Sequence, residues 1–197
     1  MLMKLFEKGL SSVVETRSRY LGYGFLLLAL IILFIAQAFF WGFVQDDAYI
    51  SLRYARNLVQ GQGIVFNPGE RVEGYSNFSW MLYSAFFIYL GVDPIDALTI
   101  SSALSGIALL LFSPYLMASL RGQRRSPWDE LCALLLASST TLALWSLSAL
   151  EQCFFALICS AGLLFVFRRR YYRAALCFSL AMLTRPEGLL FPFFAFL

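Results

Sequence analysis

The residues best suited to chemistry in this chain are two adjacent carboxylates, Asp46 and Asp47, which follow directly on a long apolar run. Residues 22–44 carry no formal charge, and as a helix rising about 1.5 Å per residue they would extend for roughly 34 Å. That length is enough to cross the hydrocarbon core of a bilayer. We therefore expect the two acids to stand at a membrane surface, where they could act on a lipid-linked substrate.

Three further charged groups interrupt apolar stretches later in the chain. Glu151 separates two apolar runs, whereas Arg185 and Glu187 lie on either side of a proline and just before a glycine, as at a helix break. Burying a charge in lipid costs about 2.5–3.5 kcal/mol on insertion scales. We therefore expect these groups to line a wet cavity, in which an arginine could bind a phosphate. The alternative for Arg185 and Glu187 is a structural ion pair.

The composition indicates an integral membrane protein. Hydrophobic residues make up 60% of the chain, aromatic residues 17%, and the mean hydropathy is +0.71. There is no histidine, which excludes histidine metal sites, histidine general bases and the membrane acyltransferases that depend on them. The cysteines have no CxxC spacing, so we expect them to be core or lipid-facing residues: Cys132, Cys153, Cys159 and Cys177.

The basic residues predict the membrane topology. Further apolar runs occupy residues 78–92, 97–120, 131–150, 152–167 and 174 onward. The positive-inside rule places the N-terminus and the arginine clusters at 121–125 and 168–173 in the cytoplasm. This threading requires that 78–92 does not cross, and at roughly 22 Å as a helix it is short for a span. Eleven of the 15 lysines and arginines then lie inside.

We therefore expect an all-α polytopic membrane protein with one transmembrane domain over residues 1–197. Its expected parts are a cytoplasmic N-terminus (1–21), a retained signal-anchor span (22–44), an external loop (45–96), spans at 97–120, 131–150 and 152–167, and a fifth span with the start of a sixth (174–197) around a break at 184–188. Because the chain stops inside an apolar stretch, we expect an N-terminal fragment of a longer protein.

The external loop is expected to hold two juxtamembrane helices, at 47–60 and 78–92. Apolar residues at helical spacing give the first of them one apolar face: Ala48, Leu52, Ala55 and Val59. The opposite face carries Asp46, Arg53 and Asn57, which we expect to turn to water. Capping of this helix is the structural alternative for Asp46 and Asp47. Between the two helices, Asn67-Pro68-Gly69-Glu70 predicts a type II turn, joining residues 64–66 and 71–73 as a short hairpin.

Five motifs carry a resemblance to a known family: Asp46-Asp47-Ala48-Tyr49-Ile50, Arg53-Tyr54-Ala55-Arg56-Asn57-Leu58, Asn67-Pro68-Gly69-Glu70-Arg71-Val72-Glu73-Gly74-Tyr75-Ser76-Asn77, Leu150-Glu151 and Leu183-Thr184-Arg185-Pro186-Glu187-Gly188. Together they resemble bacterial GT-C membrane glycosyltransferases, in particular the actinobacterial terminal arabinofuranosyltransferases that use decaprenyl-phosphate arabinose. The resemblance implies a GT-C-like helix bundle in the bacterial inner membrane and a polyprenyl-phosphate sugar donor. It also implies inverting transfer, on the periplasmic or extracellular face, to a glycan, lipid-glycan or other cell-envelope acceptor. Membrane lipids are the other expected partners, and no nucleic acid is expected.

In such an enzyme Asp46 is our candidate base for the acceptor hydroxyl, and Asp47 would orient it, hold a cation or serve as the base itself. Glu151 would bind a sugar hydroxyl or, with Asp47, a divalent cation (Mg²⁺, Mn²⁺ or Ca²⁺). Arg185 would neutralise the leaving phosphate, with Arg53 as a second candidate. The resemblance adds further residues as donor-binding candidates: Glu187, Tyr75 and Asn77.

Two other functions use the same charges. In a transporter or flippase of a lipid-linked sugar, they would form a translocation site, which predicts charges near mid-membrane and inverted repeats. We find no such repeat, and the acids cluster on one side. A non-catalytic assembly subunit is the third reading.

Overall fold

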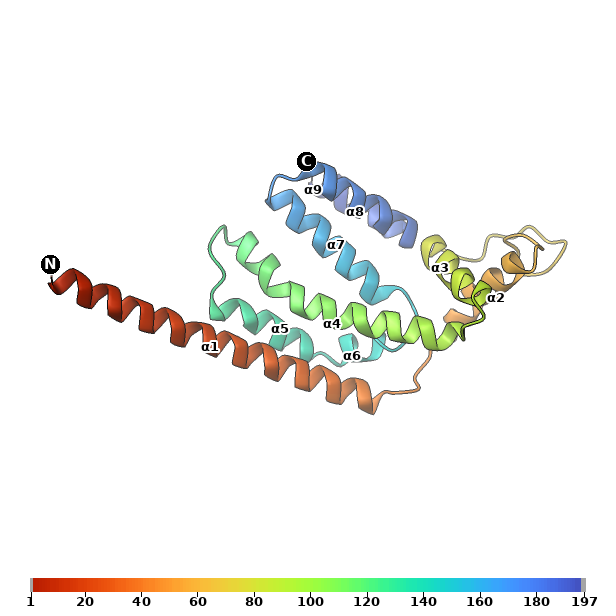
Figure 1. The fold of residues 1–197 in the computed structure, drawn as a ribbon. Coiled ribbons are helices and arrows are strands. Elements are labelled where there is room, and N and C mark those ends of the chain that lie inside the picture. Colours follow the sequence, from red (N-terminus) through yellow and green to blue (C-terminus); the bar gives the residue numbers. More distant parts are fainter. Residues whose placement is uncertain (1, 196–197) are drawn as a thin grey trace.

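The computed structural model describes the backbone of residues 2–195 and the side chains of residues 16–194. Over that range the chain forms helices joined by turns and contains no strand (Figure 1). The all-α prediction is therefore confirmed for the described residues.

Within the described residues, two helices are long and apolar enough to cross a membrane. One is the apolar part of α1 (Leu2–Phe39), over Thr16–Phe39, and the other is α4 (Pro94–Leu120). Their mean hydropathies are 2.3 and 1.9. Helix α4 begins as its sequence predicts, because Asp93 accepts a hydrogen bond from the Asp96 amide (3.1 Å) and Pro94 occupies the first turn.

The other helices pack on both sides of α4 (Figure 1). On one side α5 (Glu130–Ala137) runs along α1, and on the other α7 (Gln152–Phe167) and α8 (Tyr171–Thr184) follow in turn. Small residues allow the close approach of α1, α4 and α5, since Ala29, Ala133 and Ala137 are fully buried around Leu33 and Leu110.

The two ends of this helix array differ in chemistry (Figure 1). The loops that follow α4 and α7, which carry the arginine clusters, lie at one end. At the other end lie the short helices α2 (Asp47–Val59) and α3 (Phe78–Tyr89). Helix α8 ends beside α3, where the hydroxyls of Ser79 and Thr184 are 2.8 Å apart. A 3₁₀ turn, Pro186–Leu189, and α9 (Leu190–Ala195) then lead back along α8.

The predicted span at 131–150 is wrong as a continuous helix. After a 3₁₀ turn at Pro127–Asp129, α5 ends at Ala137, and a short α6 (Thr140–Trp145) is followed by a turn that reaches residue 150. Ser138, directly after α5, makes a local side-chain bond at this break. The Ser138 hydroxyl donates to the Leu135 carbonyl (2.8 Å), and such side-chain bonds compete with the helical backbone pattern.

One detail of the first predicted span and one of the external loop also differ from prediction. The apolar run at 22–44 is not helical throughout, because α1 ends at Phe39 and Gly42 turns the chain with φ +90°. The turn at 67–70 is present, with a Glu70 amide to Asn67 carbonyl bond of 3.1 Å, but its flanks form no hairpin. The flanks bond to α2 instead.

Candidate functional site

Asp46 and Asp47 have different positions at the start of α2. Asp46 is the N-cap, and its Oδ1 accepts hydrogen bonds from the Asp47 amide (3.1 Å) and the Gln45 side chain (3.0 Å). Asp47 is the first helical residue, is exposed and lines a pocket. The structural alternative, capping, is therefore observed for Asp46, whereas Asp47 lines the pocket.

The loop at 61–76 folds over α2 and brings the next motif to the same pocket. The Tyr54 hydroxyl donates to the Val72 carbonyl (2.8 Å) and accepts from the Gly74 amide (2.9 Å). The Asn57 amide donates to the carbonyls of Val65 (2.8 Å) and Phe66 (3.0 Å). The expectation that Asn57 faces water is therefore wrong, since only 2% of it is exposed.

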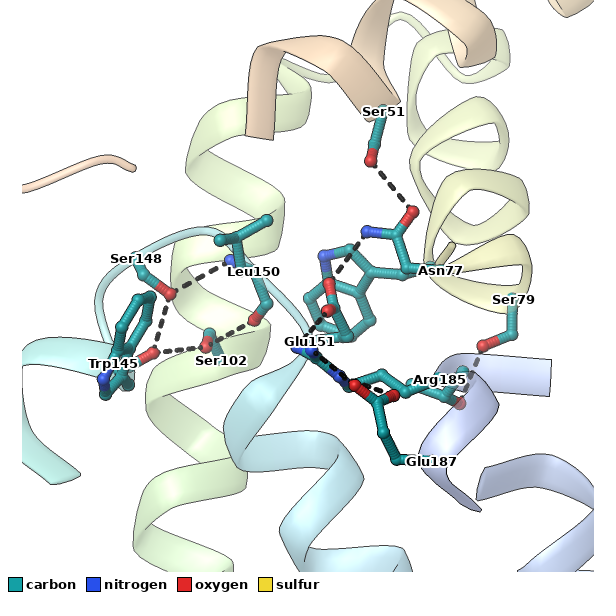
Figure 2. Close-up of polar contacts among 12 residues, drawn as sticks. Ser51, Asn77, Ser79, Ser102, Trp145, Ser148, Leu150, Glu151, Arg185 and Glu187 are labelled. Atoms are coloured by element: carbon teal, nitrogen blue, oxygen red, sulfur yellow. Dashed lines mark hydrogen bonds and ion pairs between the residues drawn. The ribbon is translucent and has the colours of Figure 1, made fainter. Parts of the chain in front are cut away.

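A chain of polar side chains connects four separate segments (Figure 2). The Ser51 hydroxyl donates to Asn77 (2.9 Å), and the Asn77 amide donates to Oε2 of Glu151 (2.8 Å). The other carboxylate oxygen, Oε1, accepts from Nη1 of Arg185 (3.1 Å). The Nε and Nη2 edge of the same guanidinium faces the carboxylate of Glu187, at 3.4 and 3.2 Å.

Glu151 is buried, with 4% exposed, and both of its oxygens have partners. These two bonds satisfy the buried carboxylate and fix it in place. Removing a partner would be costly, because the carboxylate charge would remain buried without full compensation. Glu151 therefore holds Arg185 and Asn77 rather than presenting a free carboxylate to a ligand.

The turn before Glu151 is held from several sides. Trp80 on α3 donates its indole N–H to the Ala149 carbonyl (3.0 Å), and Ser102 on α4 donates to the Leu150 carbonyl (3.0 Å). The amide of Gln45 donates to the Ser148 carbonyl (3.1 Å). Ala149 itself has φ +60°, a left-handed conformation that is costly for a residue other than glycine. These contacts keep a strained turn in the one shape that presents Glu151.

We predict that Trp80→Phe destabilises the protein by about 1–3 kcal/mol, because the Ala149 carbonyl is left buried without its donor. The apparent melting temperature in detergent should fall accordingly. Trp128→Phe is the matched control, since Trp128 is 67% exposed, and it should leave the melting temperature unchanged. Equal effects of the two substitutions would contradict a specific role for the indole bond.

The pocket has a volume of about 230 Å³. Its lining comes from the start of α2, the end of the loop, the turn before α7 and the end of α8: Asp47, Ile50, Ser51, Gly74, Tyr75, Ser76, Asn77, Leu150, Glu151, Gln152 and Arg185. Five residues predicted from sequence are thus brought together: Asp47, Tyr75, Asn77, Glu151 and Arg185.

The other predicted residues do not line this pocket. Asp46 caps α2, and the Nε of Arg53 donates to the Phe66 carbonyl (3.1 Å). Glu187 contacts the pocket only through Arg185. The sequence analysis missed Ser51 and Gln152. Among the described residues, the buried Oε1 of Gln152 has no hydrogen-bond partner, and only the place of Gln152 next to Glu151 could have indicated this residue.

Two pKa shifts describe the site's charge. The hydrogen bond from Arg185 holds the pKa of Glu187 below its usual range, so Glu187 is ionised near neutral pH. Burial, with the nearby charge of Glu73, raises the pKa of Tyr75. Tyr75 therefore keeps its phenolic proton and lines the pocket as a possible hydrogen-bond donor.

The divalent cation expected at Asp47 and Glu151 stays a prediction. Among the described residues no group of three or more His, Cys, Asp or Glu side chains is placed to hold a metal ion. Glu151, one of the two expected ligands, has one oxygen on an amide and the other on a guanidinium. A cation bound by Glu151 would therefore compete with these two partners for the carboxylate oxygens.

Comparison with known proteins found two curated relatives. A terminal β-(1→2)-arabinofuranosyltransferase of Mycobacterium tuberculosis is 35% identical over 106 residues, which cover 46% of this chain and 16% of the relative. One of the same name from Corynebacterium glutamicum is 44% identical over 50 residues, 25% of this chain and 7% of the relative. This similarity supports the predicted arabinofuranosyltransferase-like group.

The matched regions are a small part of these relatives' length, at 16% and 7%. No protein-family model matches the chain, and no solved structure matches it. The similarity to arabinofuranosyltransferases therefore rests on the two curated relatives.

Proposed function

We propose that this chain forms part of a membrane glycosyltransferase of the GT-C type, which transfers a sugar from a polyprenyl-phosphate donor to a cell-envelope acceptor with inversion. Two findings support the proposal together. The relatives are named as arabinofuranosyltransferases, and the pocket joins an exposed carboxylate, Asp47, to a fixed arginine, Arg185. The pocket is the observation that carries the proposal, since each group comes from a different segment of the chain.

In the proposed reaction, the acceptor hydroxyl oxygen attacks the anomeric carbon of the donor sugar. Asp47 takes the hydroxyl proton as the new carbon–oxygen bond forms. The bond between the anomeric carbon and the phosphate oxygen breaks, and its electron pair leaves with the polyprenyl phosphate. Arg185 stabilises the charge that develops on that phosphate. Of the two acids open for this role by sequence, Asp47 is favoured because it lines the pocket and Asp46 does not.

Arg185 is held for this role by its two carboxylates. Glu151 binds Nη1 from the buried side and serves as a positioning residue. Glu187, which is exposed, occupies the Nε and Nη2 edge. That edge offers two parallel N–H donors, the arrangement with which arginine can bind a phosphate by two bonds. We infer that the donor phosphate replaces Glu187 there, while Glu151 keeps the guanidinium in place.

Glu187→Gln should therefore lower the KM for the donor by up to about fivefold and leave kcat nearly unchanged, because it weakens an exposed ion pair that competes with the phosphate. Steady-state kinetics with varied donor would measure the effect. Glu70→Gln, at the 67–70 turn outside the pocket, is the control and should change neither constant. A raised KM in Glu187→Gln would contradict the competition and indicate direct donor binding by Glu187.

We place the pocket on the outer face of the bacterial inner membrane, with α1 and α4 crossing and both arginine-rich loops in the cytoplasm. This orientation follows the positive-inside rule, since those loops lie at the end of the array opposite α2 and α3 (Figure 1). The charged groups of the pocket come from helix ends and loops near α2 and α3, not from the middle of α1 or α4. That placement favours a transferase over a transporter.

The proposal is tested with the full chain purified in detergent, polyprenyl-phosphate arabinose as donor and an arabinan oligosaccharide as acceptor. We expect release of polyprenyl phosphate together with an extended oligosaccharide, without any ion gradient. If no product forms with this or other polyprenyl-phosphate pentoses, but reconstituted vesicles move the lipid-linked sugar between leaflets, the transporter reading replaces this one.

A further inference from the structure

A second polar pocket lies at the other end of the molecule, between α1 and the loop that joins α4 to α5. Its volume is about 410 Å³. Three arginines and one glutamate supply its charge, namely Arg19, Arg124, Arg125 and Glu130, and Ser18 and Ser126 add hydroxyls. The lining therefore holds more basic than acidic side chains in one concave site.

Hydrogen bonds and close packing hold the loop that forms one wall of this pocket. Arg121 holds the loop by paired bonds to Asp129 (2.9 and 2.6 Å), and Asp129 also accepts from the Ser126 amide (2.7 Å). Gly22 lets α1 approach closely, since a Cβ there would lie 3.3 Å from the Glu130 carboxyl and 3.4 Å from the Pro127 Cα. These contacts hold the backbone of the loop against α1 around the pocket.

Two buried atoms in the pocket have hydrogen-bonding capacity to spare. Arg125 bonds to Glu130 (2.7 Å) and lies over the ring of Tyr115, with its Cζ 4.4 Å from the centroid. The Nε donor of Arg125 and the Oε2 acceptor of Glu130 are nevertheless buried without partners. Buried polar atoms without partners are rare in folded proteins, so a ligand with both an acceptor and a donor would complete this site.

The position of the pocket identifies the ligand's source. Exposed aromatic residues surround it, namely Tyr20, Tyr23, Tyr115 and Trp128, and such residues mark the headgroup level of a bilayer. Basic pockets between helices at the cytoplasmic surface suit anionic lipid headgroups. The placement of this pocket at the cytoplasmic surface rests on the membrane orientation in the proposed function, but not on the proposed sugar transfer.

We propose that this pocket binds an anionic phospholipid whose headgroup carries a free hydroxyl, such as phosphatidylglycerol. The phosphate contacts Arg124 and Arg125, and the headgroup hydroxyl donates to Oε2 of Glu130. The bound lipid would fix α1 against the α4–α5 loop at the inner surface.

Native mass spectrometry of the full chain in detergent, titrated with phosphatidylglycerol, phosphatidic acid or phosphatidylcholine, tests the proposal. We expect phosphatidylglycerol to bind at least about tenfold more tightly than phosphatidylcholine. Arg124→Gln with Arg125→Gln should weaken phosphatidylglycerol binding by about 30-fold, and the exposed Arg124→Gln alone by about fivefold. Arg168→Gln with Arg170→Gln removes the same charge from the neighbouring exposed loop and should change binding less than twofold.

A gain of binding is expected as well, which a folding defect cannot imitate. Because Glu130 accepts from the headgroup hydroxyl, the unsubstituted protein should bind phosphatidylglycerol more tightly than phosphatidic acid. Glu130→Gln removes the negative charge and should tighten phosphatidic acid binding, so that this difference between the two lipids becomes smaller. Equal losses in the two double variants, equal binding of phosphatidylglycerol and phosphatidylcholine, or release of the lipid by excess inorganic phosphate would each overturn the proposal. The last result would indicate a site for free phosphate. None of these readouts depends on sugar transfer, so this proposal and the proposed function can fail separately.

Discussion

Asp47→Asn is expected to lower the rate of sugar transfer by about 10²–10⁴-fold, the range typical of losing a general base. Asparagine has nearly the same shape, so the pocket and donor binding should be retained while proton acceptance is lost. Single-turnover kinetics on preformed enzyme–donor complex would measure the chemical step directly. An acceptor analogue with a more acidic hydroxyl should be less affected by the substitution, because its proton is lost with less help from a base.

Asp46→Asn is the matched control for this prediction. Asn is also a good N-cap, so α2 should remain intact, and transfer should fall by less than about tenfold. If Asp46→Asn lowers the transfer rate as much as Asp47→Asn does, Asp46 would be the better candidate for the base. Near-normal transfer by Asp47→Asn would remove general-base catalysis by Asp47 from the mechanism.

The second large effect is expected at the Glu151–Arg185 pair. Arg185→Gln should reduce kcat/KM by about 10²–10³-fold, since it removes the positive charge facing the leaving phosphate. Glu151→Gln should have a similar effect, because the guanidinium loses the buried carboxylate that fixes it. The two losses should not add in the double variant, as expected for residues that act as a unit.

Arg185→Lys separates charge from geometry in the same experiment. Lysine retains the charge but cannot contact Glu151 and a phosphate with separate edges of one planar group, so we expect only partial activity. Additive losses in the Glu151→Gln and Arg185→Gln double variant would show that the two residues act independently. In that case Glu151 would contact the substrate itself, and the positioning role would be wrong.

Glu151 and Arg185 could be selected from the sequence because charge inside apolar sequence is costly. Each interrupts an apolar run, and the physics of burial requires a partner or a cavity for both. They prove to be each other's partner. The helix at 47–60 was also predictable, because its apolar spacing is regular, and it corresponds to α2 at Asp47–Val59.

The parts that escaped prediction depend on long-range contacts. Residues 131–150 have the composition of a span, but α5 ends at Ala137, where the Ser138 hydroxyl bonds to the Leu135 carbonyl. Asn57 is polar and was expected in water, yet it supplies hydrogen bonds to a loop that folds back over α2. The left-handed Ala149 is held by Trp80, 69 positions away, and no local pattern encodes such a contact.

The most direct test of the account is a structure of the protein with polyprenyl-phosphate arabinose bound, determined by electron cryomicroscopy with Asp47→Asn to prevent turnover. The account predicts the donor phosphate on the Nε and Nη2 edge of Arg185, with Glu187 displaced, Glu151 still bound to Nη1 and the anomeric carbon facing residue 47. A donor phosphate bound away from Arg185, for example at Arg53, with the Arg185–Glu187 pair intact, would contradict it.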